Sequence, residues 1–123
     1  YYYLYDGSPK VGVAFETTLI SLTKGALTST KSHLDKSVII EASDSCDIFI
    51  FNTIDKTQDW TGSLVTSTFT CDNANSYLIC IDGAPKVNST TMQKFDYSKL
   101  TSGKEYSVTL NGGVLGLFTK LVV

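Results

Sequence analysis

The sequence predicts an all-β protein, a two-layer antiparallel β-sandwich of the jelly-roll or immunoglobulin-like type with about nine strands. Short runs rich in β-branched and aromatic residues recur along the chain. Clusters of Gly, Pro, Asn and Asp separate these runs at intervals typical of sandwiches and barrels. With 123 residues, the chain has the length of one domain, so we expect a single domain over residues 1–123.

The first half of the chain contains five predicted strands. The last of these, residues 46–54, holds four large apolar residues in succession, which predicts a central strand covered on both faces. Residues 26–36 are polar and are expected to form a loop or an edge strand. The five predicted strands are residues 1–5, 11–15, 17–23, 37–42 and 46–54.

Four more strands are predicted in the second half, at residues 63–70, 76–82, 105–111 and 114–123. The two middle ones alternate between opposite faces, as half-buried strands do. The sequence Asn111-Gly112-Gly113 predicts a hairpin-type turn. Residues 55–62 are polar and are expected to form a loop. Residues 88–100 are expected to form a short helical turn or an excursion of the chain between strands.

The charged residues weigh against a nucleic-acid partner. The chain has ten Lys, no Arg, nine Asp and three Glu, for a net charge of −2. Arginine provides most bidentate contacts to phosphates and bases, and there is no basic stripe that would attract a polyanion. No run reaches the eighteen or more apolar residues of a membrane span, so membrane insertion is not expected. The start at Tyr-Tyr-Tyr favours a processed product or a piece of a longer chain.

Three cysteines, Cys46, Cys71 and Cys80, show no CxxC spacing. Zinc sites need four Cys or His ligands at regular spacings, so no metal is expected. We expect small, buried, reduced side chains, with a Cys71–Cys80 disulfide as the alternative. Acids and amides at residues 44–47 and 72–82 offer oxygen ligands of the type that calcium takes, but no EF-hand loop is present, and turn chemistry explains them better.

The sequence contains few residues that could form a catalytic site. His33 is the only histidine, and it lies in a polar segment, where a surface position is expected. No nucleophile elbow and no phosphate-binding loop is present. The sequence therefore predicts a protein that is not an enzyme and that holds no cofactor.

The aromatic residues give the candidate contact residues. Trp60 follows Asp59 in the polar segment, where its ring can stack on a sugar, anchor a protein partner or cover the sandwich core. Tyr1, Tyr3 and Tyr5 share a strand whose two faces both carry tyrosine, so some rings need cover from this domain or from a neighbouring subunit.

Two segments carry a resemblance. Residues 3–7 (YLYDG) and 100–110 (LTSGKEYSVTL) resemble segments of accessory β-sandwich domains of phage particles, in fibre, decoration and receptor-binding proteins. The second segment also resembles immunoglobulin-like and carbohydrate-binding sandwiches. The resemblance covers about 16 residues and carries no functional residue with it.

Two functions are therefore expected. The first is a non-catalytic structural or adhesion module of a virion (capsid decoration, head fibre or tail fibre) or of an extracellular or cell-surface assembly, whose partners are other protein subunits. The alternative is a carbohydrate-binding module that holds a cell-surface glycan with Trp60 and nearby Tyr or Asp residues.

Overall fold

The computed structural model describes residues 1–30, 33, 36–51 and 59–121, without the side chain of Asp59. These residues form fifteen strand segments in antiparallel sheets, which confirms the prediction of an all-β protein. Within the described residues, no helix is long and apolar enough to cross a membrane.

The chain divides into two compact units, Tyr1–Lys56 and Thr57–Val123. Each unit has its own sheets and its own cluster of buried apolar side chains. A single domain over residues 1–123 stays a prediction, as does the arrangement of the sheets in two layers.

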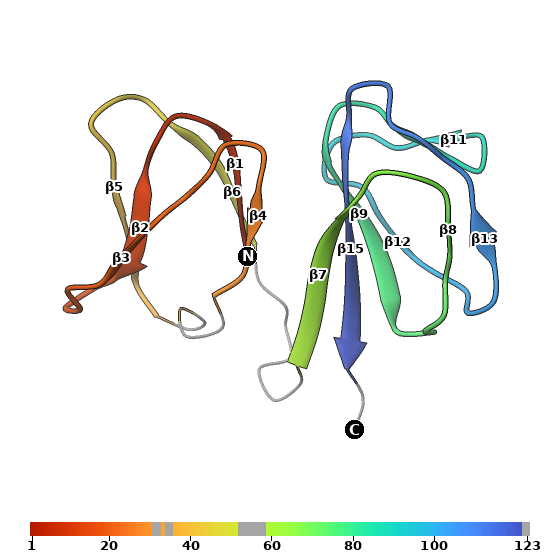
Figure 1. The fold of residues 1–123 in the computed structure, drawn as a ribbon, viewed down its shortest axis with the longest axis horizontal. Helices are drawn as coiled ribbons and strands as arrows, with labels where there is room; N and C mark the ends of the chain where they lie inside the picture. The colour runs from red at the N-terminus through yellow and green to blue at the C-terminus, as the bar shows by residue number, and fades with distance from the viewer. Residues whose placement is uncertain (31–32, 34–35, 52–58, 122–123) are drawn as a thin grey trace. The chain divides into compact units, whose positions relative to one another are not determined.

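The first sheet of unit 1 is formed by β1 (Tyr2–Asp6), β4 (Leu27–Thr28) and β6 (Asp47–Ile50), in the order β4-β1-β6 (Figure 1). Alternation along β1 turns Tyr2 and Leu4 to the core, where 2% and 1% of their surfaces are exposed. Strand β4 is a short edge strand, one of the two forms expected for this polar segment.

Strand β6 corrects the prediction of a central strand over residues 46–54. It pairs with β1 alone and forms an edge of its sheet. Its run of apolar residues has a different cause, because Ile48 packs against the core of unit 1 while Phe49 and Phe51 stack on each other with ring centres 4.6 Å apart. Ile50 is 42% exposed, and residues 52–54 lie outside the described residues.

The second sheet of unit 1 contains β2 (Lys10–Val13), β3 (Leu19–Ser21) and β5 (Val38–Glu41), in the order β3-β2-β5 (Figure 1). All three strands are shorter than predicted. The core cluster of this unit is formed by Tyr2, Leu4, Val11 and Leu22, with Ile20, Val38 and Ile48 packed against it.

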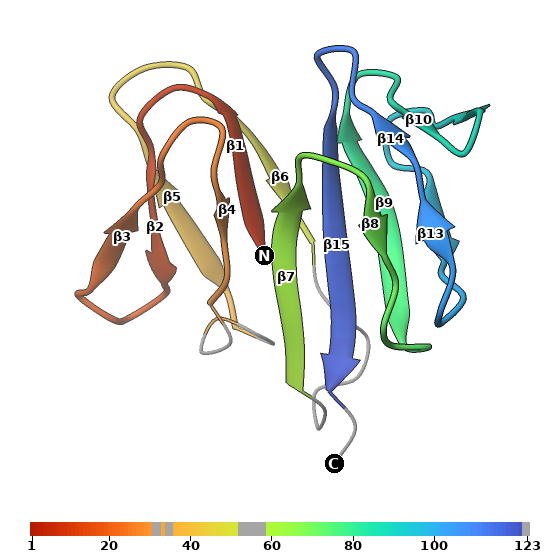
Figure 2. The same cartoon turned by 45° about the vertical axis from the view of Figure 1, so that its right-hand side comes forward.

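Unit 2 is built on a four-stranded sheet in the order β12-β9-β15-β7 (Figure 1), and Figure 2 shows β7 beside β15. Its strands are β7 (Asp59–Val65), β9 (Ser76–Asp82), β12 (Tyr97–Lys99) and β15 (Val114–Leu121). Strand β9 has the predicted bounds, and Leu78 and Cys80 on one of its faces are almost fully buried.

Five two-residue strands complete unit 2. Strands β10 (Lys86–Val87), β11 (Thr90–Thr91) and β14 (Val108–Thr109) pair in the order β11-β10-β14, and β8 (Phe69–Thr70) pairs with β13 (Glu105–Tyr106). Such short segments explain why the described residues contain more strand segments than the nine or so that the sequence predicts. The buried cluster of this unit consists of Val65, Cys71, Leu78, Cys80, Met92, Leu100, Tyr106 and Leu115.

Two turns in unit 2 differ from expectation. Residues 88–100 contain no helical turn, because Asn88 and Ser89 have φ angles of 48° and 72° and form the tight connection between the paired strands β10 and β11. Asn111 and Gly112 also have positive φ and form the predicted turn. This turn is not a hairpin, since β14 pairs with β10 whereas β15 pairs with β7 and β9.

Candidate functional site

The edge strand β5 of unit 1 exposes two large apolar side chains. Ile39 and Ile40 are each 44% exposed, although they point to opposite faces of the strand. Strand β5 pairs with β2 on one side, and no other described strand pairs with its outer side. An apolar edge strand without a partner is a template on which another strand can add.

Phe15 lies at the turn between β2 and β3 and is fully exposed, at 105% of its reference surface. Its φ of 68° lies in the left-handed region, which a bulky residue seldom occupies. The flanking residues hold this turn in place. Ala14 N–H donates to Ser37 O at 2.8 Å, and Glu16 Oε1 lies 3.6 Å from Lys36 Nζ.

Unit 2 carries an open groove of about 490 Å³ beside strand β12. Buried members of the core cluster form its floor, so the groove opens directly onto the interior of the unit. The floor residues are Leu78, Met92, Leu100 and Tyr106. Polar and exposed residues of β12 and of the β10–β11 hairpin surround this apolar floor, among them Asn88, Thr90, Thr91, Tyr97 and Ser98.

Strand β12 is a free edge of the four-stranded sheet. Just beyond it, Leu100 N–H donates to Ser76 O of β9 at 2.8 Å. Because hydrogen-bonding residues alternate in an antiparallel pair, Ser98 also bonds towards β9, whereas Tyr97 and Lys99 direct their backbone groups away from it. Within the described residues, no hydrogen bond uses these outward N–H and C=O groups.

Two charged side chains of opposite sign, Lys104 and Asp96, line the groove. Lys104 lies on the groove with its Nζ 5.4 Å from the ring centre of Tyr106, and Lys99 lies on β12. Among the described residues, neither lysine forms an ion pair. The carboxylate of Asp96 also lines the groove, where its Oδ2 accepts a hydrogen bond from Gln93 N–H at 2.9 Å.

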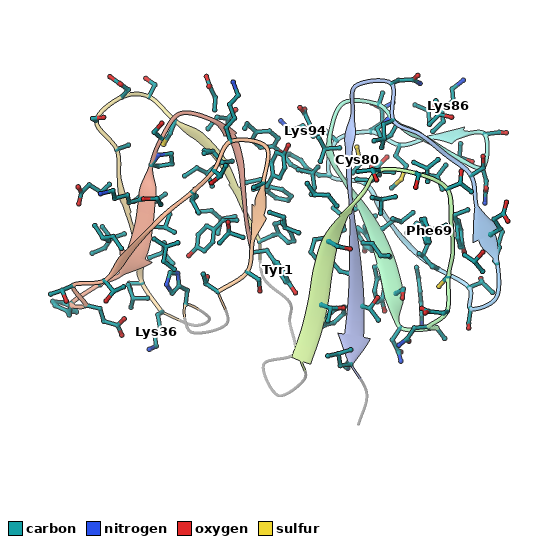
Figure 3. All side chains as sticks on the ribbon, viewed as in Figure 1. Tyr1, Lys36, Phe69, Cys80, Lys86 and Lys94 are labelled. Carbon is teal, nitrogen blue, oxygen red and sulfur yellow. The ribbon has the colours of Figure 1, made fainter. Side chains whose placement is uncertain are left out.

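The predicted contact residues Tyr1, Tyr3 and Tyr5 lie along β1 in unit 1, and the structure brings their rings into aromatic contacts. The rings of Tyr1 and Phe51 are stacked with centres 5.4 Å apart, and Tyr3 and Tyr5 meet edge to face at 5.1 Å (Figure 3 labels Tyr1). Tyr3 is only 6% exposed. Burial raises the pKa of the Tyr1 phenol.

Trp60 and Asp59 lie at the beginning of β7 in unit 2, so the prediction of a loop at this position is wrong. Pairing with β15 explains the difference, because Trp60 lies opposite Lys120 in a regular ladder. The indole is half-buried with its ring centre 5.9 Å from that of Tyr77. Among the described residues, its buried Nε1 has no hydrogen-bond partner. The Asp59 side chain lies outside the described part of the structure.

His33 differs from the expected surface histidine. It is half-buried, and its Nδ1 lies 2.9 Å from the hydroxyl of Tyr2, which is buried in the core of unit 1. The rings of the two residues also meet edge to face with centres 5.8 Å apart. This histidine therefore connects a loop to the core of unit 1.

The three cysteines are free thiols, which excludes the alternative of a Cys71–Cys80 disulfide in this structure. Cys71 and Cys80 are buried as predicted, whereas Cys46 is only half-buried. The Cys80 side chain lies in the core of unit 2 (Figure 3), and this burial raises the pKa of its thiol.

Residues 72–75 form the predicted turn rather than an open set of ligands. Asn73 Oδ1 accepts a hydrogen bond from Asn75 N–H at 2.8 Å, which is a common way for Asn to shape a turn. Within the described residues, no group of three or more His, Cys, Asp or Glu side chains comes close enough to hold a metal ion. The absence of a bound metal stays a prediction.

Comparison with protein-family models, with curated proteins and with solved structures finds no match to this chain. The resemblance to accessory domains of phage particles therefore stays a prediction.

The sequence analysis predicts neither the exposed apolar edge of β5 nor the groove beside β12. The run Val38-Ile39-Ile40 was a signal for the first, because three large apolar residues in succession cannot all face one core. No local signal indicates the groove, since its floor is assembled from β9, β13 and the segments around Met92 and Leu100.

Proposed function

We propose that this chain is a non-catalytic structural or adhesion module, of a virion or of an extracellular assembly, that acts through protein–protein contacts. The virion roles that fit are capsid decoration, head fibre and tail fibre. The observation that supports this proposal is the apolar edge of β5, with Ile39 and Ile40 each 44% exposed. Soluble proteins usually protect such edges with charges, Pro or a covering segment, because an open apolar edge recruits other strands.

Phe15 supports the same proposal from a second position in unit 1. A phenylalanine in the left-handed region costs about 1–2 kcal/mol relative to a residue that suits this conformation. Its ring gains nothing in return from the described residues, because it is fully exposed. Backbone strain of this kind clusters at functional sites, so we infer that the ring of Phe15 is kept for a contact with a partner.

The surroundings of the reactive side chains favour a structural role over catalysis. The imidazole of His33 has the Tyr2 hydroxyl as its neighbour, at 2.9 Å. Cys71 Sγ donates to the backbone oxygen of Asn73 at 3.1 Å, and the raised pKa of Cys80 keeps that thiol protonated at neutral pH. Groups held in this way are poor candidates for a base or a nucleophile.

The solution mass of the chain and of its variants, measured by light scattering after size exclusion, tests the proposal. Replacing both Ile39 and Ile40 by Thr keeps the β-branched shape but removes the apolar edge. We expect the wild type to associate and this double variant to be monomeric with an unchanged circular dichroism spectrum. Ile50→Thr is the matched control, because Ile50 has a similar exposure of 42% on the edge strand β6.

An exposed aromatic ring favours carbohydrate binding as a second candidate. Tyr97 is 74% exposed beside the groove, and polar side chains of Asn88 and Asp96 lie along the same groove. A sugar can stack on such a ring while its hydroxyls bond to the polar groups. A glycan screen with the wild type, Tyr97→Ala and Trp60→Ala tests this candidate. Binding that only one of the two variants abolishes would identify the platform, and a screen without hits would remove the candidate.

A further inference from the structure

We propose that the groove of unit 2 accepts an extended strand from a second copy of this chain, and that this strand is β5 of unit 1. The inference rests on the proposed function, because it names the partner and the contact through which the module assembles. It is carried by the free edge of β12, by the apolar floor beside it, and by the apolar edge of β5.

The backbones of β12 and β5 both offer unused hydrogen-bonding groups. Tyr97 and Lys99 direct unused N–H and C=O groups outwards from β12, two residues apart. Strand β5 has the same arrangement, because Ala14 N–H donates to Ser37 O at 2.8 Å and alternation then turns Val38 and Ile40 outwards. Two free edges with the same spacing can form a regular ladder, as in other cases where a strand adds to an exposed sheet edge.

The side chains of an added strand would also meet the groove. Such a strand places alternate side chains beside Ser98 and Leu100, on the face of the sheet that carries the floor residue Leu78. Because Ile39 and Ile40 point to opposite faces of β5, one of them faces this floor whichever way the strand runs. The contact would remove the exposed apolar surface of that isoleucine from water, which favours association.

In the part of the chain that the structure describes, one unpaired cation lies at the groove and two unpaired anions lie at the end of β5. Lys104 lines the groove together with Asp96 and forms no ion pair among the described residues. At the end of β5, Glu41 and the following Asp44 are exposed and equally unpaired within the described part of the chain. Lys104 can therefore form an ion pair with one of these carboxylates when β5 lies in the groove, and such a pair favours this contact over that of two β5 edges.

A sugar in the groove is the less favoured occupant. A sugar can bond to the polar side chains along the groove, but it would not continue the ladder of β12 and would leave the apolar edge of β5 exposed. The contact between β5 and the groove is head-to-tail, so each copy offers one donor and one acceptor, and copies add into rings or filaments.

The experiment uses two variants that each lose one half of the contact. The strand variant is Ile39→Thr with Ile40→Thr. The groove variant is Lys99→Pro. It removes one outward N–H group of β12 and keeps every N–H group that bonds to β9. Proline at such a position is tolerated in an edge strand. Lys99→Ala is its control, since it removes the charge and keeps the N–H. A second groove variant, Tyr97→Pro, is used where Lys99→Pro fails to fold by circular dichroism.

We expect each variant alone to be monomeric by light scattering, and a one-to-one mixture of the two to form a dimer, because the mixture contains one intact contact. A groove variant that assembles like the wild type would overturn the inference and leave the proposed function standing. A wild type that neither assembles nor docks to another protein would overturn both. A further outcome is a chain that binds a glycan without self-associating. If Tyr97→Ala abolishes that binding, the occupant of the groove is a sugar and the inference is overturned.

A synthetic peptide of residues 37–43 gives a readout that does not depend on assembly. By fluorescence anisotropy, the labelled peptide should bind saturably to the strand variant, whose groove is free, and at least tenfold more weakly to the groove variant. Equal binding to the two variants, or binding to neither, would overturn the inference.

Discussion

The hydroxyl oxygens of Ser76 and Thr119 lie 2.9 Å apart, across the neighbouring strands β9 and β15. Ser76 is only 3% exposed, so this bond satisfies a buried polar group inside the main sheet of unit 2. Removing either partner leaves the other hydroxyl without this bond, so the losses from the two substitutions should not add.

This bond gives a double-mutant cycle as the first prediction. We expect Ser76→Ala and Thr119→Val each to lower the free energy of unfolding by about 1–2 kcal/mol. The double variant should lose clearly less than the sum of the two, and urea denaturation measures all three. Strictly additive losses would show that the two hydroxyls do not stabilise each other.

The second prediction concerns Gly83, at the end of β9. Its φ is +72°, and an added Cβ would lie 2.7 Å from the Cα of Gly113, which is backbone and has little freedom to move. We expect Gly83→Ala to lower the free energy of unfolding by more than about 2 kcal/mol, since a steric clash adds to the cost of the left-handed conformation.

Gly103→Ala is the matched control for this prediction. Gly103 has a similar φ of +84°, but no atom lies within 4 Å of an added Cβ. Its substitution should cost only the conformational penalty of about 1–2 kcal/mol. Equal losses for the two variants would contradict the close approach between Gly83 and Gly113.

The third prediction is that Phe15→Asn stabilises the isolated chain. Asn tolerates the left-handed region, and the exposed ring of Phe15 leaves no cavity when it is removed. We expect a gain of about 0.5–1 kcal/mol in urea denaturation and no gain for Phe15→Ala, which keeps the unfavourable φ. A loss of stability in Phe15→Asn would show that the ring supports the fold rather than a partner contact.

The fourth prediction is a loss of stability at alkaline pH. Burial raises the pKa of the Cys80 thiol above its ordinary value of 9.0, and burial likewise raises the pKa of Tyr2 above 10.0. The unfolded chain therefore releases these protons at lower pH than the folded chain. The stability that these groups contribute is complete below pH 9 and is lost as the pH rises through the folded-state pKa values.

Urea denaturation at pH 8, 9 and 10 measures this loss. We expect the free energy of unfolding to fall over this range, and to fall less in Tyr2→Phe. A constant or rising value between pH 8 and 10 would contradict the assignment of buried, protonated groups at these two positions.

How far the sequence predicts the fold depends on whether a segment has local signals. Residues 76–82 have turn residues on both sides and alternate between faces, so β9 has the predicted bounds. The alternation of residues 105–110 is likewise confirmed, with Tyr106 buried and Glu105, Ser107 and Thr109 exposed. These patterns depend on the period of a strand, which the sequence contains.

The candidate surfaces depend on strand order, which has no local signal. Ile39 and Ile40 are exposed because β5 is an edge strand. The prediction of a central strand around Phe49 is wrong because β6 is also an edge strand, which the local sequence does not indicate. The polar neighbours of Trp60 predict a loop, whereas its pairing with Lys120 places it in a strand. Pairing between distant segments decides all three cases.

The most direct test of assembly through protein contacts is the solution mass of the wild-type chain, measured by light scattering over a hundredfold range of concentration. We expect species that grow beyond a dimer as the concentration rises, because each copy offers one donor strand and one acceptor groove. A chain that remains monomeric over the whole range and docks to no other protein would contradict it.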